Sequence, residues 1–278
     1  MHEFGKKALS LRRKPKRLLM NRTLDMMVSA YGFARELEYD MAILPWGATE
    51  PHNLHLPYLT DAILSHDVAV EAAELALSQF GKRCMVMPPV YMGSQNPGQR
   101  ELKFCVHARY ETQCAMLTDI VASLHHQGLR RLLIVNGHGG NSFKNMIRDL
   151  SVDYPDFVIA TSEWFKVLPA KDFFEAPGDH ADELETSVMM HYHPELVDLS
   201  MAGPGTAGGW ALPSLREGVA WIPRRWDMVS HDTGIGDPRR ATAQKGARFA
   251  QAVAQKYAHL IQEMCDAESP EQYYAPIG

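Results

Sequence analysis

Short apolar runs alternate with longer stretches of helical periodicity along this chain. Four runs have the length and composition of buried β-strands, at residues 41–46, 84–91, 132–135 and 157–161. Three longer stretches carry apolar residues at helical spacing, at residues 62–80, 111–128 and 141–154. We expect Gly128 to be the C-cap of the second helix. The alternation predicts one α/β domain, in which right-handed crossovers build a parallel sheet covered by helices on both faces.

Several potential metal ligands follow the first predicted strand, in the segment LPWGATEPHNLHLPYLTD at residues 44–61. Glu50 and His52 are two residues apart, so an extended chain would place both side chains on one side, where they could bind one ion. Asp61, or Thr60 before it, lies where a residue would cap the next helix, and a helix N-terminus favours an ionised carboxylate. In the alternative interpretation, Glu50 is a surface acid, His52 and His55 are loop residues, and Asp61 is only an N-cap.

A glycine-rich loop, Asn136-Gly-His-Gly-Gly-Asn141, follows the strand predicted at 132–135. Such a loop could form an anion-binding nest with Asn141 as the helix cap. It lacks the glycine spacing of the dinucleotide fingerprint and the lysine of the P-loop. In parallel sheets, ligands bind beyond the carboxyl ends of the strands, and this loop falls at the same edge as Glu50 and Asp61. We therefore interpret His138 as a metal ligand.

Ionisable residues are dense in a third segment, DHADELETS at residues 179–187, near the start of a helix that continues to about residue 192. Asp182 and Glu183 are explained by the first turn of a helix, whose dipole favours acids. The dipole does not explain His180, because a protonated imidazole would be unfavourable at that position.

Composition and charge narrow the class of protein. The chain has 278 residues, 46% of them hydrophobic, and a net charge of −5 with a pI near 6.2, which argues against a nucleic-acid binder and favours a small-molecule partner. Its four cysteines are scattered, as in a reduced, cytoplasmic protein. No apolar run is long enough to span a membrane, and no membrane partner is expected.

The chain is expected to contain three parts. Residues 1–40 form a basic extension and lead-in, residues 41–265 form the α/β domain, and residues 266–278 form a tail. The basic extension is interpreted as a solvated or subunit-packing segment, although it could also contact RNA or an acidic membrane. A tryptophan-rich region at residues 203–226 is expected either to close over the site or to contact another subunit.

Together, the blocks GATEPHNLHLPYLTD, NGHGGN and DHADELETS resemble the creatininase (creatinine amidohydrolase) family, in this order and at this spacing. The segment TGIGDPRRATAQKG resembles the closing motif of that family. The resemblance covers about residues 40–262. It implies a three-layer α/β/α sandwich around a mostly parallel sheet, two divalent ions per chain, hydrolysis of C–N bonds in small substrates, and a homo-oligomer, plausibly a hexamer.

The resemblance also implies a role for each candidate residue. Glu50 and His52 match the Glu-x-His ligands of the family, and Asp61 matches the bridging aspartate. His138 matches the histidine of the glycine loop, and His180 matches the catalytic histidine.

Two departures from the family pattern affect the site and its substrate. Creatinine-hydrolysing members carry a glutamate ligand where this chain has Gly140, so Glu185, or otherwise Glu183, is expected to replace it. They also carry a tryptophan where this chain has Ala176, which argues against creatinine as the substrate.

The ligand types predict the chemistry. Carboxylates and imidazoles suit zinc first, and also manganese or iron(II). Such ions activate water and polarise a carbonyl, while His180 is expected to carry a proton to the departing nitrogen. His55 is expected to orient a ligand carboxylate.

The predicted reaction is hydrolysis of a small cyclic amide or formamide. The alternatives within the family are the opening of a cyclic sugar-derived ketone and the cleavage of a peptide bond. A metal-retaining binding protein without turnover is the alternative from a different class.

Overall fold

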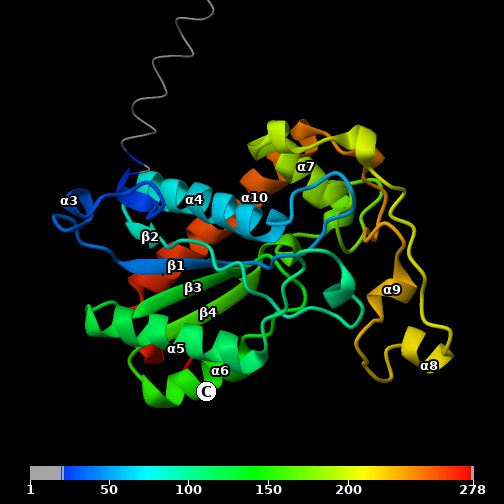
Figure 1. Cartoon of the computed structure of the whole chain (residues 1–278). Helices are drawn as coiled ribbons and strands as arrows, with labels where there is room; N and C mark the ends of the chain where they lie inside the picture. The colour runs from blue at the N-terminus through cyan, green and yellow to red at the C-terminus, as the bar shows by residue number, and fades with distance from the viewer. Residues whose placement is uncertain (1–19, 21, 277–278) are drawn as a thin grey trace, which may run out of the picture.

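A parallel sheet of four strands, in the order β2-β1-β3-β4, forms the centre of the computed structural model, which describes residue 20 and residues 22–276 (Figure 1). The strands are β1 (Met41–Trp46), β2 (Cys84–Val86), β3 (Arg131–Asn136) and β4 (Val158–Glu163). Each neighbouring pair is parallel, and Ile43 of β1 lies between Val86 of β2 and Leu133 of β3. The predicted parallel sheet is therefore confirmed.

Helices cover both faces of the sheet and complete three layers (Figure 1). One side holds α4 (Thr60–Phe80), α7 (Glu183–Tyr192) and α10 (Ala243–Asp266), and the other holds α5 (Tyr110–His126) and α6 (Lys144–Asp153). Successive strand residues point to opposite faces. Met41 and Ile43 therefore pack in the core under α4 and α10, and Ala42 and Leu44 pack in the core under α5. The predicted three-layer α/β/α sandwich is confirmed.

Proline and side-chain bonding move two element boundaries from their predicted positions. β2 ends at Val86, not at residue 91, because Pro88 and Pro89 cannot donate to the hydrogen-bond ladder. α6 begins at Lys144, and Asn141 does not cap it, because the Asn141 amide donates to the Gly47 carbonyl (3.2 Å).

The C-cap predicted for α5 was also wrong by one residue. The helix ends at His126 and its C-cap is Gln127. Gly128 follows with a φ of +92°, in the left-handed region that glycine adopts without strain.

The long helix α10 was not predicted from the sequence, and the closing motif overlaps only its first turn. Its residues Phe249, Val253, Tyr257 and Ile261 recur at four-residue spacing and are buried against α4 and α7. Leu24, before the predicted domain boundary at residue 41, is buried in the same core.

Three short α-helices of the described chain lie outside the three layers: α3 (Tyr31–Ala34), α8 (Pro213–Arg216) and α9 (Trp226–Val229). α8 and α9 project to one side of the layered body (Figure 1). The basic extension lies outside the described residues, except for residues 20 and 22 onward. In the described part of the chain, no helix is long and apolar enough to cross a membrane.

Candidate metal centre

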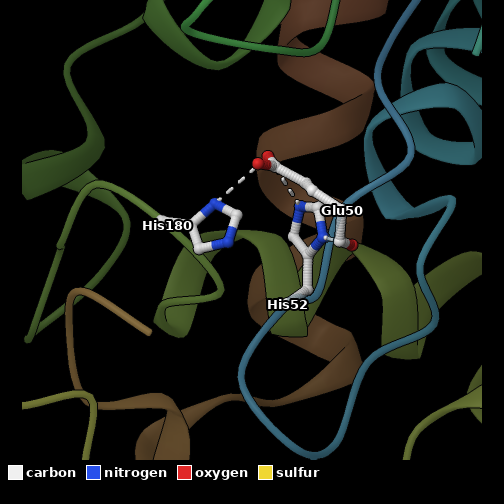
Figure 2. A group of neighbouring side chains, drawn as sticks. All are labelled: Glu50, His52 and His180. Carbon is white, nitrogen blue, oxygen red and sulfur yellow. Dashed lines mark hydrogen bonds and ion pairs between the residues drawn. The ribbon is translucent and has the colours of Figure 1, made fainter. Parts of the chain in front are cut away.

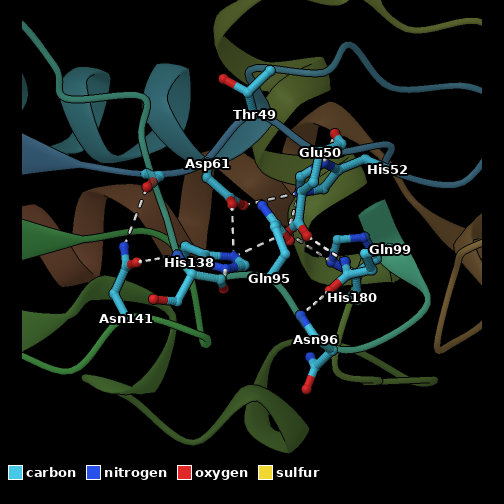
Figure 3. A network of polar contacts seen from close by, with 12 residues as sticks. Thr49, Glu50, His52, Asp61, Gln95, Asn96, Gln99, His138, Asn141 and His180 are labelled. Carbon is cyan, nitrogen blue, oxygen red and sulfur yellow. Dashed lines mark hydrogen bonds and ion pairs between the residues drawn. The ribbon is translucent and has the colours of Figure 1, made fainter. Parts of the chain in front are cut away.

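Three segments bring buried polar side chains together at the carboxyl end of the sheet (Figure 3). The loop after β1 carries Glu50, the first turn of α4 carries Asp61, and the loop after β3 carries His138. His138 Nδ1 lies 3.0 Å from Glu50 Oε1 and 3.1 Å from Asp61 Oδ2. Gly137 permits this approach, because a Cβ there would lie 2.3 Å from the Asp61 carbonyl oxygen. The three residues therefore meet beyond the carboxyl ends of the strands, where ligands of parallel sheets bind.

Neither Thr60 nor Asp61 caps α4, so that prediction was wrong. The helix begins at Thr60, and Leu59 occupies the N-cap position without a side-chain hydrogen bond. The Thr60 hydroxyl donates to the Pro57 carbonyl (2.7 Å). Asp61 instead points inward, where its Oδ1 lies 2.9 Å from His52 Nε2.

The start of α7 supplies the other side of the cluster. Asp182 is the N-cap of α7 and accepts a hydrogen bond from the Glu185 backbone N–H (3.0 Å). The Glu185 carboxylate accepts from the Ala181 N–H (2.5 Å) and lies beside His52 and Asp61. Glu183 is also buried, but it pairs with Lys245 Nζ (2.5 Å), away from the cluster. This geometry favours Glu185 over Glu183 as the replacement ligand.

The potential ligands form three overlapping groups, and within each group the ligand atoms lie within 4.8 Å of one another. The groups are Glu50–Asp61–His138, His52–Asp61–Glu185 and Glu50–His52–His180. The third is drawn in Figure 2, where both imidazoles face the Glu50 carboxylate. Asp61 belongs to the first two groups, which is the position that a bridging carboxylate requires.

The three histidines of the cluster are oriented by backbone carbonyls. One ring nitrogen of each lies at hydrogen-bond distance from a carbonyl oxygen: His52 Nδ1 from Glu50 O (3.0 Å), His138 Nε2 from Ser94 O (2.7 Å) and His180 Nε2 from Pro51 O (2.9 Å). Because a carbonyl oxygen only accepts, that nitrogen must carry the hydrogen. The other nitrogen of each ring faces the carboxylates, and once it carries no hydrogen it can bind a metal, as in histidines that bind metals.

The electrostatics of the cluster also fit a cation. Burial opposes protonation of His52, but the Asp61 carboxylate outweighs it and raises the pKa of His52 to about 10. Burial raises the pKa of Glu185 to about 8. Asp61 Oδ2 is buried without a hydrogen bond, although His138 is close. A divalent ion would satisfy this oxygen, hold Glu185 ionised and replace the proton on His52.

Sequence reasoning was wrong about His55 and missed Gln99. His55 Nε2 pairs with the Thr186 hydroxyl (2.8 Å), so it orients no ligand carboxylate. Gln99 is buried and donates from Nε2 to Glu50 Oε2 (2.6 Å). Its position in a Gly/Pro-rich loop gave no signal of this role.

A cleft of about 1350 Å³ opens onto the cluster. Its lining includes the polar residues Ser94, Gln95 and Asn96. It also includes the three tryptophans of the region at residues 203–226: Trp210, Trp221 and Trp226. That region thus lines the cleft that opens onto the cluster.

Comparisons with known proteins give a family match for most of the chain. The family model named Creatininase, described as creatinine amidohydrolase, matches residues 31–261. The mycofactocin precursor peptide peptidase of Mycobacterium ulcerans (strain Agy99) is 32% identical over 221 residues, which are 76% of this chain and 80% of the relative.

Solved structures extend the comparison. A crystal structure from Bacteroides fragilis NCTC 9343, provisionally named creatinine amidohydrolase, is 61% identical with a TM-score of 0.88 and covers 89% of this chain and 98% of its own. Creatininase structures described as a Zn-Zn type and an Mn form are 24% identical, with TM-scores of 0.64 and coverage of 80% and 90%. At that identity, they support the shared fold alone.

Proposed function

This chain belongs to the creatininase family of hydrolases, and we propose that it cleaves the C–N bond of a small cyclic amide or formamide with the help of two divalent ions. The observation that carries the proposal is the pair of buried ligand groups that share Asp61. In the proposed site, Glu50, Asp61 and His138 hold one ion, and His52, Asp61 and Glu185 hold the other. Zinc is the first expectation for this donor set, with manganese and iron(II) as alternatives.

The bound ions would supply water activation and carbonyl polarisation. The chain itself supplies proton transfer through His180. Burial, followed by the charge of His52, lowers the pKa of His180, so the free ring is neutral at pH 7. Its Nε2–H faces the Pro51 carbonyl, and its Nδ1 lies 3.6 Å from Glu50 Oε1. Nδ1 is therefore placed to take a proton at the centre and return it to the departing nitrogen.

A second substrate class, a peptide, is favoured by the size of the cleft. Ligand pockets usually measure about 300–1,000 Å³, and this cleft of about 1350 Å³ exceeds what a small ring fills. A relative that covers most of this chain is named as a peptidase. We therefore propose peptide bonds as the second candidate for the same chemistry.

A substrate screen with metal analysis tests both candidates. The protein is loaded with Zn²⁺ or Mn²⁺, its metal content is measured, and lactams, formamides, cyclic ketones and short peptides are assayed for hydrolysis. We expect two ions per chain and turnover of an amide, and His180→Asn is the control that keeps the ions and loses turnover. Two ions without turnover of any compound would instead favour a binding protein.

We also propose that the chain forms a homo-oligomer, plausibly a hexamer. This rests on the family membership. Light scattering at micromolar concentration tests it, and a monomer would contradict it.

A further inference from the structure

His180 is held by a segment that follows it by about fifty residues. Its backbone pairs with Ile235, since His180 N–H donates to Ile235 O (3.1 Å) and Ile235 N–H donates to His180 O (2.8 Å). Its ring packs edge-to-face against the indole of Trp226, with centroids 5.2 Å apart and planes at 89°. On another side, the ring contacts His52, at a centroid distance of 4.3 Å. Trp226 is thus one of two rings that bound the His180 imidazole.

Trp226 is itself fixed from several directions. Its indole Nε1–H donates to the Thr233 carbonyl (3.2 Å), and its backbone N–H donates to the Pro97 carbonyl (2.8 Å). The guanidinium of Arg224 lies 5.0 Å from its ring centroid. Only 4% of Trp226 is exposed. The indole is therefore a rigid surface for His180.

The backbone conformation of Thr233 also supports the position of Trp226. Its φ is +67°, in the left-handed region that a β-branched residue rarely adopts. Such conformations persist where the surrounding structure enforces them, often at functional sites. Here the conformation aims the Thr233 carbonyl at Trp226, and its hydroxyl lies 3.4 Å from the Pro51 carbonyl, the group that also faces His180 Nε2.

From these contacts we propose that Trp226 is a positioning residue for His180, an inference that rests on the proposed role of His180 in proton transfer. The indole blocks rotation of the imidazole, so that Nε2 stays on Pro51 and Nδ1 stays directed at Glu50. Trp226 also lines the cleft, so it joins the substrate wall to the proton-transfer group.

The test compares Trp226→Ala with Trp226→Phe in the Zn²⁺-loaded protein. Met228→Ala is the matched control, because Met228 lies in the same helix and is 76% exposed. Crystal structures report the position of His180 whether or not a substrate is known. We expect the His180 ring to turn away from Pro51 in Trp226→Ala and to keep its place in Trp226→Phe and Met228→Ala. An unmoved ring in Trp226→Ala would overturn the proposal.

Kinetics on any amide found in the screen give the second readout. Misplacement of a catalytic group costs up to about 100-fold in rate. We therefore expect Trp226→Ala to lower kcat by about 10- to 100-fold, with KM changed by less than about 3-fold and with metal content unchanged. Trp226→Phe should restore most of kcat. A rise in KM alone would show that Trp226 is only a wall for substrate. Failure of the proposed function is recognised separately, because the wild-type protein would then lack turnover.

Discussion

The candidate centre has two halves: Glu50, Asp61 and His138 at the sheet edge, and His52, Asp61 and Glu185 beside α7. The two halves differ in how their charges are compensated. In the half at the sheet edge, burial opposes ionisation of Glu50, but His138 outweighs it and lowers the pKa of that carboxyl. In the half beside α7, burial dominates and raises the pKa of Glu185 to about 8. The first half is therefore charged and paired without an ion. The second contains a carboxyl group that needs a cation to be ionised at neutral pH.

Asp61 is shared by the two halves, so its substitution is expected to have the largest effect. Asp61→Asn is expected to abolish binding of both ions and to lower activity to background. Loss of metal assistance worth about 4 kcal/mol corresponds to about 1,000-fold or more in rate. Metal analysis and rate measurements check this result. If one ion is retained at full occupancy, Asp61 is not a bridge.

Glu185→Gln should affect metal binding in only one of the two halves. An amide cannot supply the ionised oxygen, so we expect the ion held with His52 and Asp61 to be lost and the other to remain, with activity falling together with it. Metal content per chain, measured after dialysis, is the readout. Two ions and full turnover would leave Glu185 as a structural acid only.

Glu183→Gln is the matched control for that variant. Glu183 bonds to Lys245 and accepts from the backbone N–H groups of Glu175 and Ala176. Its substitution weakens a buried ion pair, so we expect lower thermal stability with both ions still bound. Loss of an ion in Glu183→Gln would contradict the assignment of Glu185.

Most of the fold could be predicted because apolar periodicity reports burial directly. The cores of β1, β3 and α4 were found within a residue or two, since both faces of the sheet are covered. The failures lie at helix starts such as those at Asn141 and Thr60. The Asn141 side chain bonds to Gly47 across the fold, and the Thr60 hydroxyl bonds back to Pro57 instead of capping its own helix. Sequence spacing carries no information about a distant partner such as Gly47.

The candidate ligands could be proposed because strand ends and the family resemblance both point to one edge of the sheet. The groups that orient these ligands and His180 could not be predicted from the sequence. Gln99 and the carbonyl of Ser94 come from a loop without periodicity, and Trp226 reaches His180 only through the tertiary structure. Whether the ligands bind ions stays a prediction until metal is measured.

Gly140→Ala should weaken metal binding by the half at the sheet edge, with a smaller effect than the substitutions of Asp61 and Glu185. A Cβ at residue 140 would lie 2.2 Å from Ser94 O and 2.5 Å from His138 Nε2, so it would break the hydrogen bond that orients His138. Loss of such an orienting bond typically costs about 10- to 100-fold in metal affinity. Gly139→Ala is the control, because a Cβ there meets nothing within 4 Å. Equal metal affinities in the two variants would contradict this role of Ser94 and Gly140.

The smallest expected effect is a pH dependence that belongs mainly to the half beside α7. In the metal-free protein, the pKa of Glu185 is raised from 4.5 to about 8, and that of His52 from 6.5 to about 10. A group whose pKa is higher in the folded than in the unfolded protein stabilises the fold at pH values below its unfolded pKa. This stabilisation is lost as the pH rises through its folded pKa. Glu185 therefore destabilises the metal-free fold progressively from about pH 4.5 to pH 8, and His52 adds to this above pH 6.5.

Bound ions reverse this trend, because they take Glu185 as a carboxylate and His52 as a neutral ring. The difference in Tm between Zn²⁺-loaded and EDTA-treated protein should therefore widen between pH 6 and pH 8. One proton corresponds to about 1.4 kcal/mol per pH unit, or about 4 °C in a protein of this size. Thermal unfolding at several pH values measures the difference. In Glu185→Gln the widening should largely disappear, since the ion that displaces the proton of His52 is lost together with the carboxylate. A constant difference in the wild-type protein would show that neither group exchanges its proton for an ion.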